Sequence, residues 1–328
     1  MASDLAARAD HESLKVAAEW YARLQNADIG AQQRLAWQQW LDARPEHRSA
    51  WAHVEAVSRR FAVLRADGER DAGEQAIQVA SQRPSARRRA AGSILALGGV
   101  GLLGWFGWRF TPLPAVVTAW RADYATGIGE QRRLVLDDGT RVWLNTRSAI
   151  DVRLDDTQRL LTLAGGEILI DTAQDPRQRP FFVDTRFGRL QALGTRYTVR
   201  QADDDILLAV YEGQVRIRTL SGREALVNRG EQKRYSADAI SAAAPADPAR
   251  QAWSRGVLLA ENLPLGELVA ELGRYHLGYT GVDPRIASLR VIGRYPANDL
   301  PRTLAMLERE LPIRVQRTLP WWVTLEPK

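Results

Sequence analysis

The sequence predicts a multi-domain protein with a small all-α bundle, one transmembrane helix, an all-β domain of sandwich or solenoid type, and a C-terminal α+β domain. Three observations predict this order: an uncharged run at residues 90–108, helical spacing of apolar residues before it, and short alternating strands after it. We expect the domain boundaries at residues 1–82, 83–110, 111–245 and 246–328.

The uncharged run begins at Ala90 and ends at Trp108. At about 1.5 Å per residue it is just long enough to cross a hydrocarbon core of about 30 Å as a helix. Arginines at residues 87–89 precede it, which favours a cytoplasmic N-terminus. A buried core helix is usually shorter and has a polar side, and a signal peptide would lie at the extreme N-terminus. The sequence therefore predicts a single-pass membrane protein.

Glycine occupies six positions of this run, and each glycine lowers helix stability by about 1 kcal/mol relative to alanine. An intramembrane protease must unwind its substrate helix, so this composition favours proteolytic release of the N-terminal part. Gly98, Gly101, Gly104 and Gly107 are alternatively spaced to pack against a neighbouring helix, although the spacing differs from the four-residue dimer pattern.

Composition excludes several classes of function. The net charge is +6, but residues 1–82 carry ten basic and twelve acidic side chains and no basic stripe with aromatic residues, so we expect no direct nucleic-acid binding. The absence of cysteine excludes disulfides and thiolate metal sites. The four histidines form no zinc-protease motif, and no phosphate-binding loop is present. We expect no metal, no cofactor and no conventional enzyme.

The segment before the run predicts three helices, at residues 12–24, at about 31–41, and from Pro45 onward. Its tryptophans are interpreted mainly as core residues, and alternatively as the lining of a groove for a partner protein. Residues 67–86 lose the apolar periodicity and gain polar residues, glycine and proline, which predicts a linker.

The segment after the run predicts two modules. Alternation predicts strands at 133–136, 141–144, 167–171, 181–184 and 207–211, with no long helix between them. After a linker at 237–250, the pattern predicts strands at 257–260, 279–282, 289–295, 313–317 and 322–325, with helices opened near Pro264 and Asp299.

The chain resembles the FecR family of bacterial transmembrane sensors, which are anti-sigma regulators of iron-siderophore uptake. Its outer half is similar to the FecR domain in the strings LDDGTRVWLN (136–145), GGEILIDT (165–172), RPFFVDT (179–185) and LGTRYTV (193–199). Its C-terminal part is similar to the secretin and TonB short N-terminal domain in NLPLGELVAELGRYH (262–276). The N-terminal part resembles the family through Trp20–Leu24 and a string that contains Trp40, Leu41, Pro45, His47, Ala50 and Trp51.

The resemblance implies an inner-membrane sensor whose N-terminus is cytoplasmic and whose C-terminus is periplasmic. It implies that Trp20, Trp40, Leu41 and Trp51 bind an extracytoplasmic-function sigma factor. It also implies that the region around Leu265, Leu268 and Tyr275 meets the signalling domain of a TonB-dependent siderophore receptor, and that periplasmic and intramembrane proteases process the chain. Whether the protein inhibits its sigma factor, activates it after processing, or does both stays open.

The resemblance also singles out the bond between Gly194 and Thr195, because some FecR-type sensors break themselves at a Gly-Thr bond by an N-to-O acyl shift. Glycine leaves the carbonyl accessible, and threonine supplies the hydroxyl nucleophile. An ordinary turn followed by a strand is the alternative. Two alternative functions stay open. The protein could be an envelope adaptor that docks to a secretin or transport complex without transcriptional output, or a membrane-bound self-cleaving protein.

Overall fold

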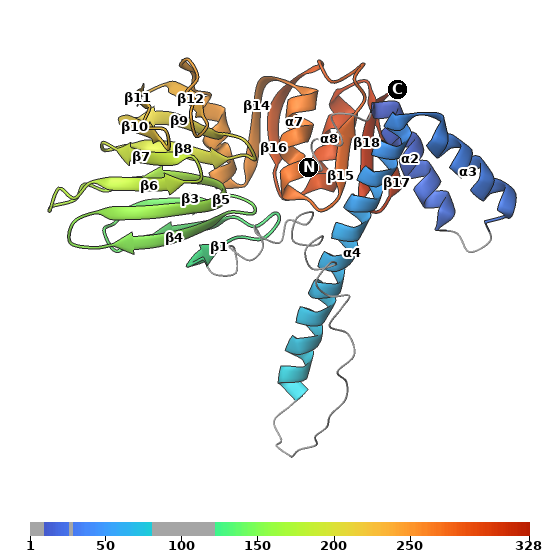
Figure 1. Ribbon diagram of the computed structural model, residues 1–328, viewed down its shortest axis with the longest axis horizontal. Coiled ribbons are helices and arrows are strands. Elements are labelled where there is room, and N and C mark those ends of the chain that lie inside the picture. The colour runs from blue at the N-terminus through green and yellow to red at the C-terminus, as the bar shows by residue number, and fades with distance from the viewer. Residues whose placement is uncertain (1–9, 26–28, 81–121) are drawn as a thin grey trace. The chain divides into compact units, whose positions relative to one another are not determined.

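A computed structural model of the chain describes residues 10–25, 29–80 and 122–328 (Figure 1). The predicted membrane segment from Ala90 to Trp108 lies outside these ranges, and within them no helix is long and apolar enough to span a membrane. The chain divides into two compact units. One comprises residues 1–93, 262–291 and 301–328, and the other comprises residues 94–261 and 292–300.

The first unit contains the three predicted N-terminal helices, which are α2 (His11–Leu24), α3 (Ala31–Ala43) and α4 (Pro45–Ala80). Asp10 caps α2, because its carboxylate accepts a hydrogen bond of 2.7 Å from the backbone N–H of Ser13. This hydrogen bond stabilises the charged form and lowers the pKa of Asp10. Small residues at the contact between α2 and α4 allow the two helices to approach closely, and Ala17, Ala18 and Ala50 are fully buried.

Helix α4 is longer than the sequence analysis expects. It continues to Ala80, through most of the segment from residue 67 that we interpreted as a linker. The error has a physical reason, since loss of apolar periodicity signals only the loss of a buried face. Residues 67–80 contain three alanines, two glutamates and two glutamines, which have high helix propensity.

The C-terminal module has the predicted order of strands and helices. It contains β14 (Val257–Pro264), α7 (Leu265–Leu272), a 3₁₀ turn η2 (Gly273–Tyr275), β15 (Tyr279–Val282), β16 (Arg290–Pro296), α8 (Leu300–Glu310), β17 (Ile313–Leu319) and β18 (Trp322–Pro327). Strand β18 is central in a three-stranded sheet, where it pairs parallel with β15 and antiparallel with β17. A second, two-stranded sheet pairs β14 with β16.

Within the first unit, α2 and α4 also pack against the C-terminal sheet. Leu14 and Val57 share an apolar cluster with Trp321 and Trp322. At its edge, the Lys15 ammonium lies 2.9 Å from the Glu326 carboxylate, and this contact raises the pKa of Lys15. The structure therefore brings together two modules that the sequence analysis places on opposite sides of a membrane.

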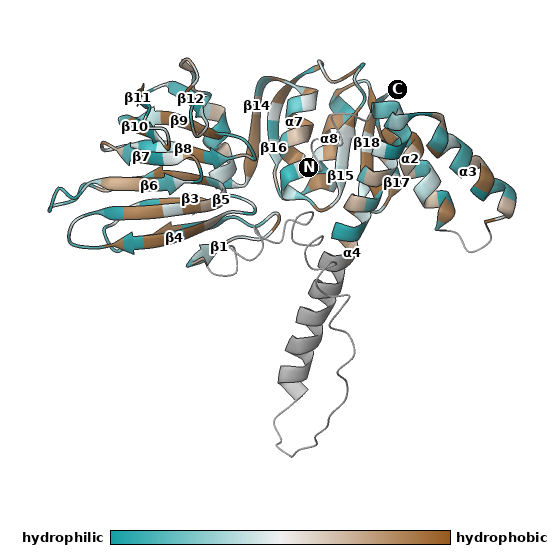
Figure 2. Cartoon of the chain, in the orientation of Figure 1, coloured by the Kyte–Doolittle hydropathy of each residue, from teal (hydrophilic) through white to brown (hydrophobic). Residues whose placement is uncertain are grey.

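The second unit is built around a continuous arrangement of thirteen strands. These are β1 (Tyr124–Ala125), β2 (Arg132–Val135), β3 (Arg141–Leu144), β4 (Ala149–Leu154), β5 (Arg159–Asp171), β6 (Phe181–Thr185), β7 (Gly188–Ala192), β8 (Arg196–Gln201), β9 (Ile206–Glu212), β10 (Gln214–Thr219), β11 (Glu224–Asn228), β12 (Glu231–Tyr235) and β13 (Ala244–Pro245). Hydrophobic and hydrophilic residues alternate along strands such as β10, which buries every second residue (Figure 2).

Strand β5 belongs to two sheets. Its first half pairs with β4 and with β6, and its second half pairs with β3 and β8. Gly166 lies between the halves at φ +85°, and a Cβ there would lie 2.3 Å from the Ser148 hydroxyl oxygen, so only glycine fits. The two sheets enclose one apolar core, to which Ile150 and Leu161 contribute from one sheet and Tyr197 and Val199 from the other. This is the sandwich alternative of the prediction.

A buried ion pair joins the turn before β3 to the beginning of β5. The Arg159 guanidinium donates to the Asp138 carboxylate at 3.0 Å, and their side chains are only 8% and 2% exposed. Arg159 also donates to the backbone carbonyls of Ala173 and Arg179 at 3.0 Å each, and its guanidinium lies over the Phe181 ring. The segments that Arg159 joins therefore supply a carboxylate and two backbone carbonyls to its buried guanidinium.

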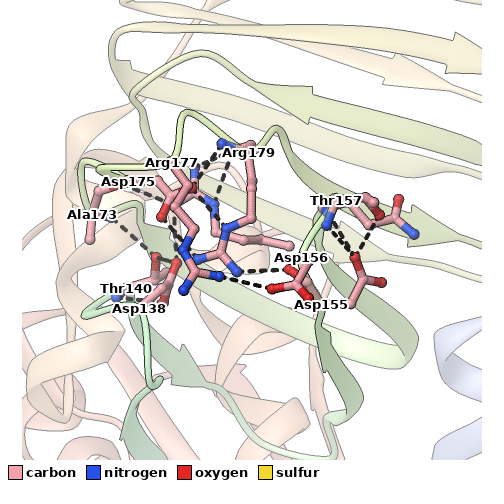
Figure 3. A network of polar contacts seen from close by, with 11 residues as sticks. Asp138, Thr140, Asp155, Asp156, Thr157, Ala173, Asp175, Arg177 and Arg179 are labelled. Carbon is pink, nitrogen blue, oxygen red and sulfur yellow. Dashed lines mark hydrogen bonds and ion pairs between the residues drawn. The ribbon is translucent and has the colours of Figure 1, made fainter.

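Further polar contacts extend this network over the loop between β5 and β6 (Figure 3). Thr140 donates its hydroxyl to Asp138 at 2.8 Å and accepts the N–H of Ala173 at 3.1 Å. In the loop itself, the Asp175 carboxylate accepts hydrogen bonds from the backbone and side chain of Arg179 at 2.8 and 2.9 Å. The loop at residues 172–180 is thereby fixed against β5.

We predict that Asp138→Ala destabilises the β domain by about 3–5 kcal/mol, because it leaves the Arg159 charge buried and unpaired. Asp156→Ala is the matched control. Its ion pair with Arg177 is 94% and 66% exposed, so its loss should cost less than about 1 kcal/mol. Urea unfolding, with hydrogen exchange of β5 as the local readout, measures both. Equal effects of the two substitutions would contradict a structural role for the buried pair.

Candidate functional site

The Gly194–Thr195 bond lies in the tight connection between β7 and β8. Gly194 is exposed and has φ +72°, a left-handed conformation that favours glycine. Thr195 is only 3% exposed. The carbonyl of Gly194 packs against Gly213, where a Cβ would lie 2.1 Å from the Gly194 oxygen. Sequence reasoning did not single out Gly213, although its place between two alternating strands signals a close backbone approach.

The Thr195 side chain and backbone are held by defined hydrogen bonds. Its hydroxyl oxygen accepts from the N–H of Leu193 at 3.0 Å, and the hydroxyl donates to the carbonyl of Gln214 at 2.8 Å. The N–H of Thr195 donates to the Thr172 hydroxyl at 2.8 Å. A carbonyl oxygen does not take the hydroxyl proton at neutral pH, so these contacts hold Thr195 as an un-ionised hydroxyl beside the bond.

A cavity of about 430 Å³ adjoins this bond, between the turn that contains Gly194 and the loop at residues 172–181. Asp175 is the one acidic residue in its lining. Hydrogen bonds from the Arg179 side chain hold the pKa of Asp175 far below its usual range. Asp175 is therefore a carboxylate of low basicity that is already bound to a cation. Sequence reasoning missed it, and the Asp-Pro turn at 175–176 was the available signal.

In the N-terminal module, the predicted sigma-binding residues Trp40 and Trp51 each take part in an aromatic contact. Trp40 stacks on His47 with ring centroids 4.4 Å apart, and His47 Nδ1 lies 2.6 Å from the Trp40 carbonyl. The rings of Trp51 and Trp37 lie 5.0 Å apart. This stacking fixes α3 to α4 while leaving the tryptophan rings half-buried.

Trp20 and Leu41 are also half-buried. Trp20 lies on α2, with the Arg23 guanidinium 5.3 Å from the centre of its ring. Helix α3 has no buried residue, although it carries Leu35, Trp37, Trp40 and Leu41. Its apolar side chains are thus partly open to solvent, and the indole Nε1 of Trp37 is buried with no hydrogen-bond partner among the described residues.

The residues that we assigned to receptor binding form part of the C-terminal core. Leu265, Leu268 and Tyr275 are at most 2% exposed. Their spacing reflects the buried face of α7 and the turn after it, so they set the position of these elements and do not reach the surface of the module. Any contact of this region with a partner must be made by other residues.

Comparison with known proteins assigns two parts of the chain. Residues 122–216 match the family model described as FecR protein, and residues 15–57 match a domain of unknown function designated DUF4880. The first match begins just before β1 and ends within β10, and the second extends from α2 into α4. No curated protein is significantly similar to the chain.

Solved structures with a similar fold exist. Two crystal structures of a proposed anti-sigma factor from Parabacteroides distasonis ATCC 8503, at 1.65 Å and 2.50 Å resolution, are each 22% identical to this chain with a TM-score of 0.50. Each alignment covers 62% of this chain and 98% of the solved chain. At this identity the likeness is one of fold.

Proposed function

This chain is a FecR-domain protein, and we propose that it is a single-pass inner-membrane regulator. Its N-terminal module binds an extracytoplasmic-function sigma factor in the cytoplasm. Its FecR domain and C-terminal module receive a signal in the periplasm from a TonB-dependent siderophore receptor. The observation that carries the proposal is the order of the parts, since the two family matches lie on opposite sides of the uncharged run at residues 90–108.

Half-buried aromatic side chains on α2, α3 and α4 support the sigma-factor interface. An isolated bundle gains stability by burying large aromatic rings, and here four tryptophans stay only half-buried: Trp20, Trp37, Trp40 and Trp51. Partly exposed tryptophans are the residue type that most often dominates binding energy at protein interfaces. The proposed anti-sigma function of the structurally similar proteins agrees with a sigma factor as the partner.

The periplasmic signal must also be passed across the membrane to the N-terminal module. We propose that receptor engagement exposes the periplasmic part to proteolysis and that an intramembrane protease then releases the N-terminal module. One isolated helix can slide or rotate in lipid without changing the fold at its inner end. Glycines lower the cost of unwinding it by about 1 kcal/mol each relative to alanine.

We predict that Trp20→Ala lowers the amount of sigma factor that co-purifies with the full-length chain by about tenfold or more. Leu35→Ala is the matched control, because Leu35 is 55% exposed on the opposite side of α3 from Trp37 and Trp40. It should change recovery less than twofold. Quantitative mass spectrometry of the purified complex measures both, with far-UV circular dichroism as the check of folding.

Two outcomes would contradict the proposal. Absence of any sigma factor from the wild-type complex in native cells favours the envelope adaptor. Equal recovery with Trp20→Ala and with Leu35→Ala removes Trp20 from the proposed interface.

We propose self-cleavage at Gly194–Thr195 as a second function, favoured by a buried threonine hydroxyl that directly follows an exposed glycine in the left-handed conformation. The Thr195 oxygen attacks the carbonyl carbon of Gly194, the C–N bond breaks, and the hydroxyl proton passes to the nitrogen, which becomes an amine. Water then hydrolyses the resulting ester to a Gly194 carboxylate and the Thr195 hydroxyl. Release from the Gln214 carbonyl must precede the attack.

We predict that Thr195→Val leaves a single full-length species, whereas Thr195→Ser retains cleavage. Valine keeps the shape of threonine and removes the nucleophile. Intact mass spectrometry measures the fragments, and hydroxylamine should trap the ester as a Gly194 hydroxamate in the wild type and in Thr195→Ser, but not in Thr195→Val. Near-UV circular dichroism reports whether the valine variant folds. Fragments that begin at residue 195 in a folded Thr195→Val protein would exclude this nucleophile.

A further inference from the structure

A second cavity of the β domain has a different chemistry from the one beside Gly194. Its volume is about 490 Å³, and it is lined by residues from β2, β3, the beginning of β8 and the 3₁₀ helix η1 (Pro248–Arg255). We call it the arginine pocket, defined by Arg132, Arg133, Trp143, Arg196, Trp253 and Arg255. All of these residues belong to one compact unit.

The arginine pocket concentrates positive charge without matching negative charge. Four arginines line it, and no acidic residue does. Arg196 is neutralised by Asp171, at 3.3 Å, and also donates to the Gln251 side chain at 2.9 Å. Within the described residues, no carboxylate lies within 4.0 Å of the guanidinium of Arg132, Arg133 or Arg255. Arg132 and Arg133 are neighbours on β2 and project to opposite faces of it. Arg133 and Arg255 are therefore the two uncompensated charges that the pocket can bring together, an arrangement that an anion would stabilise.

Aromatic rings contact three of the four arginines, Arg132, Arg133 and Arg196. Arg133 and Trp143 face each other across the β2–β3 pair, with the guanidinium 5.4 Å from the ring centre. Arg196 approaches the same ring at 5.3 Å, and Arg132 lies 5.4 Å from the Tyr124 ring. Stacking leaves the N–H edges of a guanidinium available as donors. Part of the entropy cost of ordering long side chains around a ligand is therefore met before binding.

A buried donor adds to these features. Trp253 is 2% exposed and lines the pocket, and its indole Nε1 has no hydrogen-bond partner among the described residues. A buried N–H without an acceptor is costly, and native structures rarely leave one unpaired. An oxygen-rich ligand in the pocket would supply an acceptor near this side of η1.

We infer that the arginine pocket binds a phosphate group of two negative charges, as a phosphomonoester or a diphosphate. A single carboxylate neutralises one guanidinium, whereas the oxygens of a phosphate accept from several donors at once and match the fork of each arginine. The same group occurs in soluble phosphate esters and in the headgroups of phosphate-bearing lipids. The inference rests on this pocket alone and is independent of the sigma-factor interface.

The test is calorimetric titration of the purified full-length chain in detergent with inorganic pyrophosphate. We expect a single site, and Arg133→Gln or Arg255→Gln should weaken binding by about tenfold, as expected for the loss of a charge-assisted hydrogen bond. The matched control is Arg223→Gln, an exposed arginine in the turn before β11, which should leave binding within twofold. Near-UV circular dichroism of each variant verifies the fold.

A second titration distinguishes the two sources of phosphate. Dihexanoyl phosphatidic acid presents the group as a lipid headgroup, and dihexanoyl phosphatidylcholine controls for its acyl chains. Tighter binding of phosphatidic acid than of pyrophosphate assigns the pocket to a headgroup, and the reverse order assigns it to a soluble ester. The inference is overturned when neither phosphate probe binds the wild type, or when Arg133→Gln, Arg255→Gln and Arg223→Gln bind them equally.

Discussion

The buried ion pair between Arg159 and Asp138 is the constraint on which the β domain depends. A guanidinium this deeply buried is stable only when its donors are satisfied, and here they are satisfied by segments far apart in sequence. The turn before β3, the first residue of β5 and the loop at residues 172–180 are thus fixed to one another. That loop forms one wall of the cavity beside Gly194, so the buried ion pair also helps to shape the surroundings of the Gly194–Thr195 bond.

Sequence reasoning recovered the elements whose side chains carry a clear pattern. The strands β3 and β15 have the predicted bounds, because alternation and the Asp-Asp-Gly turn are local signals. Strand β5 was found only in its second half. It passes through Gly165 and Gly166 into a second sheet, and a strand buried against two sheets loses its alternation. The end of α4 was missed because helix propensity persists after the apolar face ends.

Site residues were harder to predict than elements. A regular apolar pattern singled out Leu265, Leu268 and Tyr275. This pattern reflects their burial in the core of the C-terminal module, and buried side chains do not contact a partner. The arginine pocket escaped because its residues are separated by up to about 120 positions in the sequence and come together only through the folding of the β domain. Asp175 was missed although its Asp-Pro turn and its partner Arg179 are local in sequence. Conversely, the half-buried tryptophans of the N-terminal module were visible from spacing, because a helix face is a local property.

The contact between the helical module and the C-terminal sheet bears directly on the proposed membrane topology. The structure packs Leu14 and Val57 against Trp321 and Trp322, whereas a membrane crossing at residues 90–108 would separate these surfaces and leave each one open to a partner. The proposed regulator needs that separation. The opposing surfaces are apolar and carry the oppositely charged residues Lys15 and Glu326, which are properties that suit binding to other proteins in two compartments.

The most direct measurement is cysteine accessibility, which is unambiguous here because the chain contains no native cysteine. Ala36→Cys and Ala243→Cys place single thiols at exposed positions of the helical module and the β domain. In spheroplasts, a membrane-impermeant maleimide should label Ala243→Cys at once and Ala36→Cys only after lysis. Labelling of both in intact spheroplasts, or of neither, would place the two modules in one compartment and contradict the account.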